Sequence, residues 1–252
     1  MKLLTLARDL RRRKSREHQH LFTAEGVRAV EELLRSPLTV RGALVAPHLV
    51  HDARGEALLA RLRAAGTQIL EVTEPELDSA SDTDSPQGVL AIGEIPRLTL
   101  DTLDVGAVAR VVVLDAVQDP GNAGTIVRTA AALGASAAVA LPGTVDLWNP
   151  KVVRSAMGAS FRFPTLSGTW AELDAFRRRH EMPLWGADAG GAPLDASRTP
   201  ARLALAVGNE GAGLSQDARQ RADLLVALPI GGAVESLNVA VATGILLYQL
   251  RS

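Results

Sequence analysis

Three apolar strands predicted in the second half of the chain each run directly into a glycine-rich turn. The first covers residues 110–116 and contains the apolar run Val111–Leu114, which is typical of a strand buried on both faces of a parallel sheet. The other two cover residues 202–207 and 223–228. Ligands bind in the crevice at the carboxyl ends of such strands. The sequence therefore predicts an α/β fold whose ligand crevice lies where the three turns meet.

The third turn leads into the most apolar helix of the sequence, predicted over residues 236–250. Two glycines, Gly231 and Gly232, approach this helix, and Ser236 and Asn238 stand at its start. A helix start offers free backbone N–H groups, so these small polar side chains suit a ligand site. An apolar helix behind the site indicates that it is built into a core.

Strands and helices also alternate in the first half of the chain, which indicates a second α/β unit. A break rich in Pro, Gly and Asp separates the halves. We therefore expect a front domain at 1–95, a linker at 96–109 and a second domain at 110–252. Helices are predicted over residues 1–35, 53–65, 125–133, 169–180 and 215–221, and further strands over 40–46, 67–72, 87–95, 136–141 and 183–187.

Composition excludes several classes of function. The 252 residues include no cysteine, so disulfides, thiolate metal sites and cysteine nucleophiles are excluded. The five histidines lie outside the glycine-rich turns and lack metal-ligand spacing, so no metal is expected. No apolar run approaches the roughly 20 residues that span a bilayer, and no secretory signal is recognisable. A cytoplasmic protein is expected.

The net charge of −1 does not indicate a broadly basic nucleic-acid binder, but residues 8–16 form a local cationic cluster. Such a cluster attracts phosphate backbones, and its binding weakens with salt. A solvated helix face explains the same cluster equally well.

Each turn also has a purely structural interpretation. Asp-Pro-Gly-Asn at 119–122 is a good turn sequence, Asn238 is suited to cap a helix, and Arg128 on an apolar helix is typical of a salt-bridged side chain. The glycines at 208–213 match neither the dinucleotide fingerprint nor the P-loop, which disfavours an oxidoreductase.

Taken together and in this order, the three turns resemble the three sequence motifs of the SpoU/TrmH branch of the SPOUT methyltransferases. The matching positions are Asn122, Gly124, Arg128 and Thr129 in the first motif, 208–211, Gly213 and Leu214 in the second, and Pro229, Gly232, 236–239, Val241 and Ala242 in the third. The segment 149–158 resembles the family's intermediate segment. Residues 22–26 and 85–90 resemble the start and end of the L30e-like RNA-binding domain found in front of many members.

The resemblance implies S-adenosylmethionine-dependent methyl transfer to a ribose 2′-hydroxyl in RNA. It also implies a deep trefoil knot in the second domain, a homodimer formed through that domain, and an RNA-binding front domain. Backbone around Gly208, Leu228, Ile230 and Leu237 is expected to hold the cofactor. The activated sulfonium needs no metal.

The same resemblance implies the catalytic residues. Arg128 is expected at the reacting hydroxyl, where arginine's retention of its proton favours orienting the RNA and stabilising the oxyanion over acting as a base. Whether it acts as base or orienting group, and within its own subunit or across the dimer, stays open. Asn122 and Glu210 are expected to fix Arg128 and the loop, and Ser236 and Asn238 to complete the pocket.

The leading hypothesis is a ribosomal RNA methyltransferase acting on 23S rRNA. The alternatives are the same chemistry on tRNA, an rRNA methylase of the thiostrepton-resistance type, and a non-catalytic RNA-binding or ribosome-assembly protein.

Overall fold

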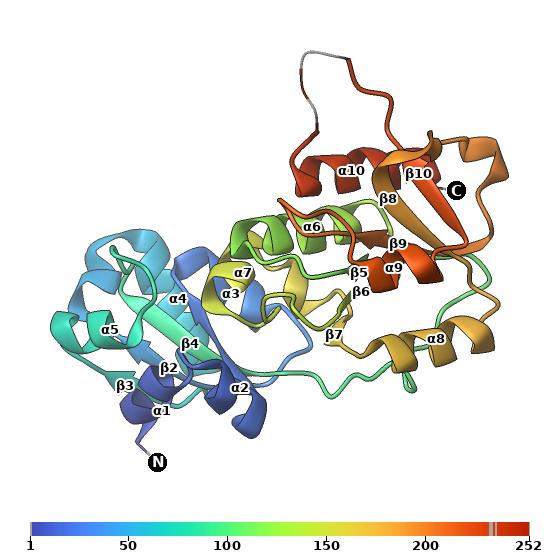
Figure 1. Cartoon of the computed structure of the whole chain (residues 1–252). Coiled ribbons are helices and arrows are strands. Elements are labelled where there is room, and N and C mark those ends of the chain that lie inside the picture. Colours follow the sequence, from blue (N-terminus) through green and yellow to red (C-terminus); the bar gives the residue numbers. More distant parts are fainter. Residues whose placement is uncertain (1, 232–233, 235, 252) are drawn as a thin grey trace. The chain divides into compact units, whose positions relative to one another are not determined.

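Figure 1 shows the computed structural model of the chain, which describes residues 2–231, 234 and 236–251. The chain divides into two compact units. Unit 1 comprises Met1–Arg97 and Trp148–Arg162, and unit 2 comprises Leu98–Leu147 and Phe163–Ser252. The chain therefore passes between the units three times.

Unit 1 is built on a four-stranded mixed sheet in the order β1-β4-β2-β3. Its central strand β4 is antiparallel to β1 and β2, and β3 pairs parallel with β2. Val89 and Ala91 of β4 belong to one core cluster, whereas Leu90 and Ile92 belong to another. This alternation follows from the period of two in a strand and shows that both faces of the sheet are buried. The strands are β1 (Leu21–Glu25), β2 (Val40–Val45), β3 (Ile69–Glu71) and β4 (Val89–Glu94).

Helices surround this sheet, and local sequence explains where several of them begin. Asp52 caps α4 by accepting from the N–H of Gly55, and Thr73 and Glu76 form a capping box at α5. Asn149 caps α7 in the same way, with Pro150 at its first position. The helices are α1 (Leu3–Asp9), α2 (Arg13–Gln19), α3 (Val27–Leu34), α4 (Ala53–Ala64), α5 (Glu74–Ala80) and α7 (Pro150–Ser155), with 3₁₀ turns η1 (Pro47–His51) and η2 (Ala159–Phe161).

The segment Trp148–Arg162 is part of the core of unit 1. The ring of Phe22 on β1 lies 4.6 Å from that of Trp148 and 5.5 Å from that of Phe161, centroid to centroid. Val153 of α7 joins the same buried cluster. The compact units thus differ here from the predicted domain limits of 1–95, 96–109 and 110–252, which placed this segment in the second domain.

Unit 2 contains a six-stranded sheet in the order β10-β8-β9-β5-β6-β7, and every strand pair in it is parallel. This confirms the predicted α/β class with a parallel sheet. All six residues of β5 are buried, as its run of apolar residues predicts. The strands are β5 (Ala109–Leu114), β6 (Ala137–Ala140), β7 (Thr165–Ser167), β8 (Leu184–Pro193), β9 (Arg202–Val207) and β10 (Leu224–Ala227).

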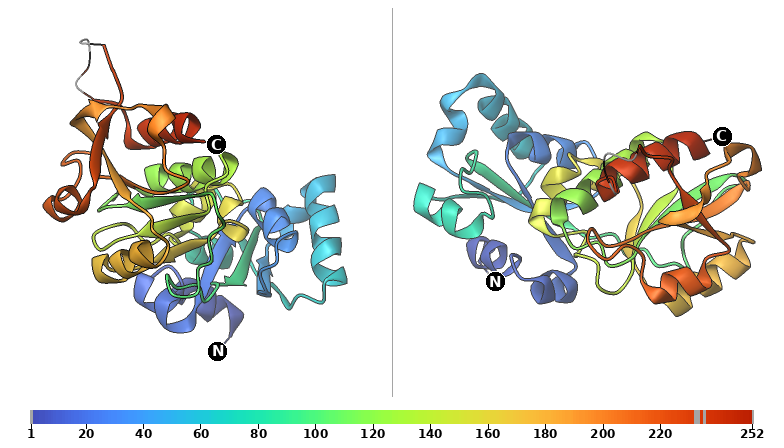
Figure 2. Two further views of the ribbon diagram at one scale, coloured as in Figure 1. Left: turned by 90° about the vertical axis from the view of Figure 1, so that its right-hand side faces the viewer. Right: turned by 45° about the horizontal axis from the view of Figure 1, so that its top comes forward.

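Two helices of unit 2, α6 and α10, lie side by side in both views of Figure 2. Gly244 permits this contact, because a Cβ there would lie 3.3 Å from the side chain of Thr129. The buried Arg110 ties the end of α10 to the sheet by donating to the carbonyls of Leu250 (2.7 Å), Ala201 (2.7 Å) and Ala109 (2.9 Å). The helices of unit 2 are α6 (Pro120–Ala132), α8 (Trp170–Arg179), α9 (Gln216–Arg221) and α10 (Val239–Leu250), with the 3₁₀ turn η3 (Ala196–Arg198).

Three of the secondary-structure predictions are wrong. Residues 21–25 form β1 and not helix, because pairing with β4 overrides the helical spacing, and Gly26 at φ +89° separates β1 from α3. Helix α6 begins at Pro120 and not at residue 125, since Asp119 caps it and proline fits its first position. Helix α10 begins at Val239 and not at residue 236, because Asn238 caps it.

Within the residues that the structure describes, none of the helices combines the length and apolar character needed to cross a bilayer.

Candidate functional site

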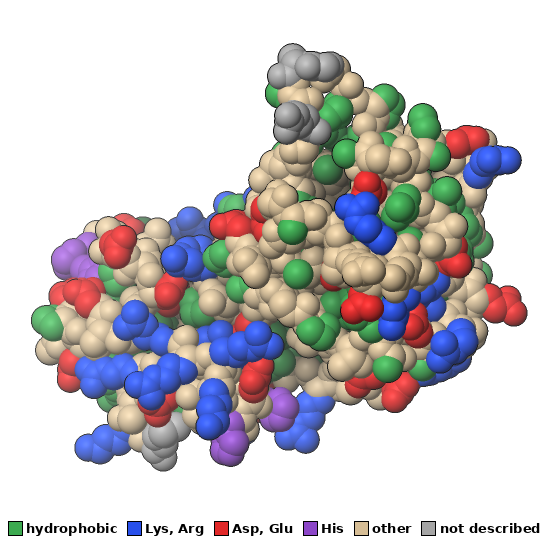
Figure 3. Space-filling model, in the orientation of Figure 1, with side chains coloured by type: hydrophobic (Ala, Val, Ile, Leu, Met, Phe, Trp, Pro, Cys, Tyr) green, Lys and Arg blue, Asp and Glu red, His purple; other side chains and the backbone are tan. Residues whose placement is uncertain are grey.

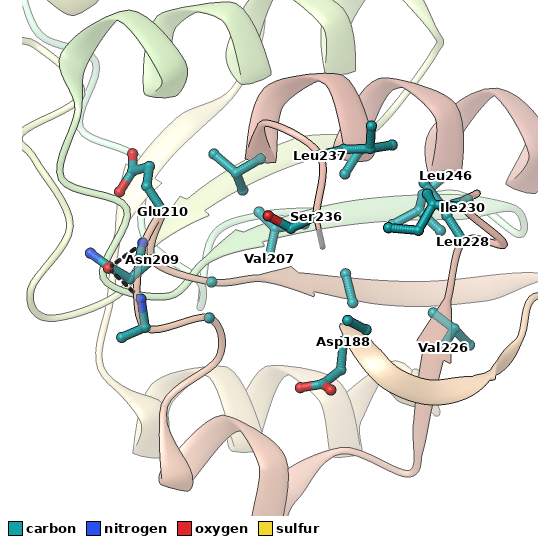
Figure 4. Close-up of a pocket in the computed structure, with 18 of the residues that line it drawn as sticks. Asp188, Val207, Asn209, Glu210, Val226, Leu228, Ile230, Ser236, Leu237 and Leu246 are labelled. Carbon is teal, nitrogen blue, oxygen red and sulfur yellow. Dashed lines mark hydrogen bonds between the residues drawn. The ribbon is translucent and has the colours of Figure 1, made fainter. Parts of the chain in front are cut away.

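A cavity of about 350 Å³ opens at the carboxyl ends of β9 and β10 and at the middle of β8 in unit 2 (Figure 4). It lies where the sequence predicts the crevice, at the meeting point of turns that follow parallel strands. Its lining residues come from those strand ends, the loop after β9, the chain before α10 and α10 itself. They include Asp188, Val207, Gly208, Glu210, Val226, Leu228, Ile230, Ser236, Leu237, Ala242 and Leu246.

The cavity has an apolar end and a polar side. The side chains of Leu228, Ile230 and Leu246 lie together at one end in Figure 4. The hydroxyl of Ser236 and the carboxylate of Asp188 supply polar groups, and Asp188 is paired with Arg219. This combination suits a ligand with one flat apolar part and one charged part.

The loop after β9 is held in a tight hairpin by close backbone contacts. Asn209 and Gly213 exchange backbone hydrogen bonds of 2.9 Å, and the Oδ1 of Asn209 accepts from the N–H groups of Gly211 and Ala212 at 3.0 Å. A Cβ on Gly208 would lie 2.2 Å from the backbone of Gly213, so glycine is required there. The loop is therefore a rigid wall of the cavity.

A chain of hydrogen bonds joins the three predicted motifs. The carboxylate of Glu210 accepts from the Nδ2 of Asn122 (3.1 Å) and from the backbone N–H groups of Asp119 (3.0 Å) and Gln118 (3.2 Å). The Oδ1 of Asn122 in turn accepts from the Nδ2 of Asn238 (2.9 Å). The Oδ1 of Asn238 caps α10, accepting from the N–H groups at positions 240 and 241. Glu210 thus couples the start of α6 to the start of α10.

These donors also determine the protonation of Glu210. Desolvation by burial raises its pKa and is the largest single effect, but it is outweighed by hydrogen bonds to the carboxylate. With donors at Asn122, Gln118 and Asp119, the pKa of Glu210 lies below its ordinary value. The group is therefore a charged acceptor at neutral pH and not a proton donor.

The structure brings most of the predicted site residues together. Gly208, Glu210, Leu228, Ile230, Ser236 and Leu237 line the cavity, Asn122 is hydrogen-bonded to Glu210, and Asn238 is hydrogen-bonded to Asn122. Arg128 is exposed on α6 and is not a lining residue. Gly232, which matches the third motif, lies outside the described residues.

Sequence reasoning missed Asp188 as a lining residue. Its position just after the predicted strand 183–187 was a signal, because that strand pairs with β9 and the pairing stops at Gly186, two residues before Asp188. Asn209 was recognised within the second motif, but its role in closing the loop required the structure.

In the described part of the chain, no group of three or more His, Asp or Glu side chains is placed to hold a metal ion.

Comparison with sequence families gives two matches that cover most of the chain. The SpoU rRNA Methylase family matches residues 109–248, and the MRM3-like substrate binding domain matches residues 5–91.

Individual relatives are similar over nearly the whole chain. The 23S rRNA (guanosine(2553)-2'-O)-methyltransferase RlmP of Bacillus subtilis is 35% identical over 245 residues, which cover 97% of this chain and 94% of that protein. The structure of the SpoU methyltransferase AviRb from Streptomyces viridochromogenes with AdoMet has a TM-score of 0.88 and 28% identity, covering 98% of this chain and 96% of that one. An AdoMet-bound rRNA methyltransferase from Sinorhizobium meliloti has a TM-score of 0.83 and 30% identity, covering 99% of this chain and 94% of that one.

Proposed function

This chain belongs to the SpoU rRNA Methylase family, and from that premise we propose that it methylates a ribose 2′-hydroxyl of 23S rRNA with S-adenosylmethionine as methyl donor. The observation that carries the proposal is the hydrogen-bonded chain Glu210–Asn122–Asn238, which joins three separate motifs beside one cavity. The related proteins named as 23S rRNA 2′-O-methyltransferases, and the two related structures with AdoMet, support the substrate and the cofactor.

The cavity fits S-adenosylmethionine. Its volume is within the usual range for small-molecule sites, and the apolar end formed by Leu228, Ile230 and Leu246 suits an adenine ring. Backbone at Gly208, Leu228, Ile230 and Leu237 is proposed to hold the adenosine. When bound, the cofactor supplies a methyl group already activated on a positively charged sulfur. The remaining task of the chain is to place the hydroxyl and to stabilise the charge it develops.

We assign Arg128 to that task. A guanidinium that keeps its proton is suited to hold the RNA phosphate and the developing oxyanion. Asn122 and Glu210 fix the first turn of the helix that carries Arg128, since they tie the start of α6 to the loop after β9. Ser236 and Asn238 complete the pocket at the start of α10.

We further propose that the active enzyme is a homodimer and that Arg128 acts across its interface. Helix α10 exposes an apolar stripe at helical spacing, formed by Val241 (52% exposed), Ile245 (38%) and Tyr248 (52%). Arg128 is exposed on α6, the helix that packs against α10, and does not line the cavity of its own subunit. A two-fold partner that covers the stripe offers a second cavity for this side chain.

The remaining proposals concern the setting of the site. Residues 1–95 are assigned as the RNA-binding domain, 96–109 as a linker and 110–252 as the knotted methyltransferase domain. Lys and Arg side chains lie over α1 and α2 in Figure 3, where the cationic cluster 8–16 is proposed to contact phosphates. The protein is proposed to act in the cytoplasm, where ribosomal RNA is assembled, without a metal.

The experiment that tests the function is transfer of radiolabelled methyl groups into unmodified 23S rRNA and, separately, tRNA. We expect label in 23S rRNA and at least a 100-fold loss of rate for Arg128→Ala, about the effect of removing one oxyanion donor. Label in tRNA alone would overturn the assignment of 23S rRNA as the substrate. Absence of label in both, with cofactor binding intact, would favour a non-catalytic RNA-binding role.

Subunit complementation tests the position of Arg128. Leu237→Arg fills the cavity from a part-exposed position and is expected to abolish cofactor binding without unfolding the chain. Mixing it with Arg128→Ala is expected to restore about a quarter of the wild-type rate, because half of the dimers then contain one intact composite site. If the mixture stays inactive, Arg128 acts within its own subunit.

A further inference from the structure

Unit 1 contains a cavity of its own, separate from the cofactor cavity of unit 2. It measures about 220 Å³, several times the roughly 30 Å³ that one water molecule occupies. Three stretches of chain line it: the end of β1 with the start of α3, the loop before β4, and α7 with the residue pair after it. The lining residues are Glu25, Gly26, Arg28, Ala29, Thr83, Ser85, Gln87, Arg154 and Met157.

Glu25, which lines this cavity, has a buried acceptor without a hydrogen-bond donor. The side chain of Glu25 is only 5% exposed, and its Oε1 accepts from the N–H of Asp82 at 2.8 Å. Its Oε2 is buried and accepts no hydrogen bond from the residues that the structure describes, and the same holds for the Oδ2 of Asp82. Unsatisfied buried acceptors are costly, so such a pair is expected to be retained for a partner.

Arg154 does not satisfy these oxygens. Its nitrogens lie 3.6 Å from the Oε2 of Glu25 and 3.7 Å from the Oδ2 of Asp82, beyond hydrogen-bond length. A tight structural ion pair would be shorter by most of an ångström. Arg154 is 40% exposed and makes no hydrogen bond to either oxygen, so its side chain can turn away and leave the Oε2 of Glu25 to a ligand with N–H donors. In keeping with this, burial raises the pKa of Glu25 above its ordinary value.

The other walls suit a flat aromatic ligand. Met157 is 39% exposed at the cavity, and a thioether side chain packs well on an aromatic face. Arg28 and Arg154 are both exposed and supply cations for carbonyl oxygens or phosphates. Gln87 fixes the mouth, since its Oε1 accepts from the N–H of Val27 at 3.2 Å.

We propose that this cavity binds one unpaired guanine base of the RNA substrate, with the carboxylate of Glu25 accepting from its pairing edge. Guanine is the RNA base that presents an imino and an amino N–H side by side on that edge, which matches the two oxygens of one carboxylate. Its O6 and N7 are the acceptors that arginine prefers, and Arg28 and Arg154 are at hand. The inference rests on the proposed function, because it takes the ligand to be RNA.

The test measures binding of short single-stranded oligouridine RNAs that carry one central guanosine, inosine or adenosine. The full-length protein is used at moderately high salt, so that phosphate contacts do not dominate. We expect the guanosine RNA to bind about tenfold more tightly than the adenosine RNA, with inosine, which lacks the amino group, between them. Equal affinities for the three RNAs would overturn the proposal.

Variants connect the discrimination to the cavity. Glu25→Gln and Ser85→Trp, which fills the cavity from an exposed loop, are each expected to bind guanosine and adenosine RNA equally. The matched control Glu71→Gln removes an exposed carboxylate of the same unit and is expected to keep the tenfold difference. If Glu25→Gln does not fold, Ser85→Trp decides, and retained discrimination in Ser85→Trp contradicts the site.

Free guanosine monophosphate distinguishes the source of the base. Weak binding of the mononucleotide, with a clear gain for the RNA, is the expected result. Tight mononucleotide binding without further gain in RNA would overturn the assignment to RNA. Loss of methyl transfer in the assay for the proposed function leaves this comparison intact, so the two proposals fail independently.

Discussion

Two glutamates, one in each unit, are placed in opposite circumstances. Glu210 of unit 2 lies at an exposed loop, yet its carboxylate accepts three hydrogen bonds from the start of α6. Glu25 of unit 1 is nearly inaccessible, yet one of its oxygens accepts no hydrogen bond from the described residues. A carboxylate with all its donors present holds a loop in place, whereas one without them is available for a ligand.

Glu210→Ala tests this comparison with the largest expected effect. Removal of the acceptor leaves the donors at 118, 119 and 122 unpaired and frees the start of α6, so we expect methyl transfer to fall about 100-fold, or roughly 2.7 kcal/mol. Discrimination between guanosine and adenosine RNA should not change. The control Asp217→Asn, an exposed carboxylate of unit 2, should leave both unaltered. Unchanged methyl transfer in Glu210→Ala would contradict the loop-holding role.

Glu25→Gln is expected to have a smaller effect, and it is expected to stabilise unit 1. Because it replaces a desolvated charge with a neutral amide of the same shape, we expect the free energy of unfolding of unit 1 to rise by about 1 kcal/mol. Hydrogen exchange of amides in β1 and β4 measures this locally, which avoids treating a two-unit chain as two-state. A large loss of protection in these strands would show that Glu25 already has a structural partner.

The contributions of the two carboxylates to stability are expected to change with pH in opposite directions. The pKa of Glu210 is lowered in the folded chain, so its contribution is present above its ordinary pKa and is lost as the pH falls through the folded value. The pKa of Glu25 is raised, chiefly by burial, so its contribution is present at low pH and is lost as the pH rises through the folded value. Hydrogen exchange of each unit from about pH 4 to pH 7, in wild type, Glu210→Ala and Glu25→Gln, measures both. Slopes of the same sign would contradict the comparison.

Much of unit 2 is predictable from sequence because its signals are local. The apolar run in β5 determines a buried parallel strand, and the glycine turns determine the sheet edge that carries the cavity. The start of α6 was misplaced because Asp119, Pro120 and Gly121 suit a turn and a helix start equally well. In the structure Asp119 caps the helix and its own N–H is bound by Glu210, which favours the helix start.

Features that depend on distant pairing were not predictable. Residues 21–25 have spacing compatible with a helix, and only β4, which follows far along the chain, makes them a strand. Neither composition nor periodicity indicates that an oxygen of Glu25 lacks a hydrogen-bond donor or that Arg128 is exposed. Both depend on which segments the fold places beside them.

The aromatic contacts of Phe22 with Trp148 and Phe161 have a consequence for how the protein is made. A nascent chain that has emerged only as far as residue 97 contains all four strands of unit 1 but none of the segment that closes its core. Unit 1 therefore stays incomplete during translation while β5, α6 and β6 are synthesised. Its core closes only after residues 148–162 have been synthesised. A protein expressed as its first 97 residues alone would expose Phe22, so a gene divided at the apparent boundary would encode an incomplete unit.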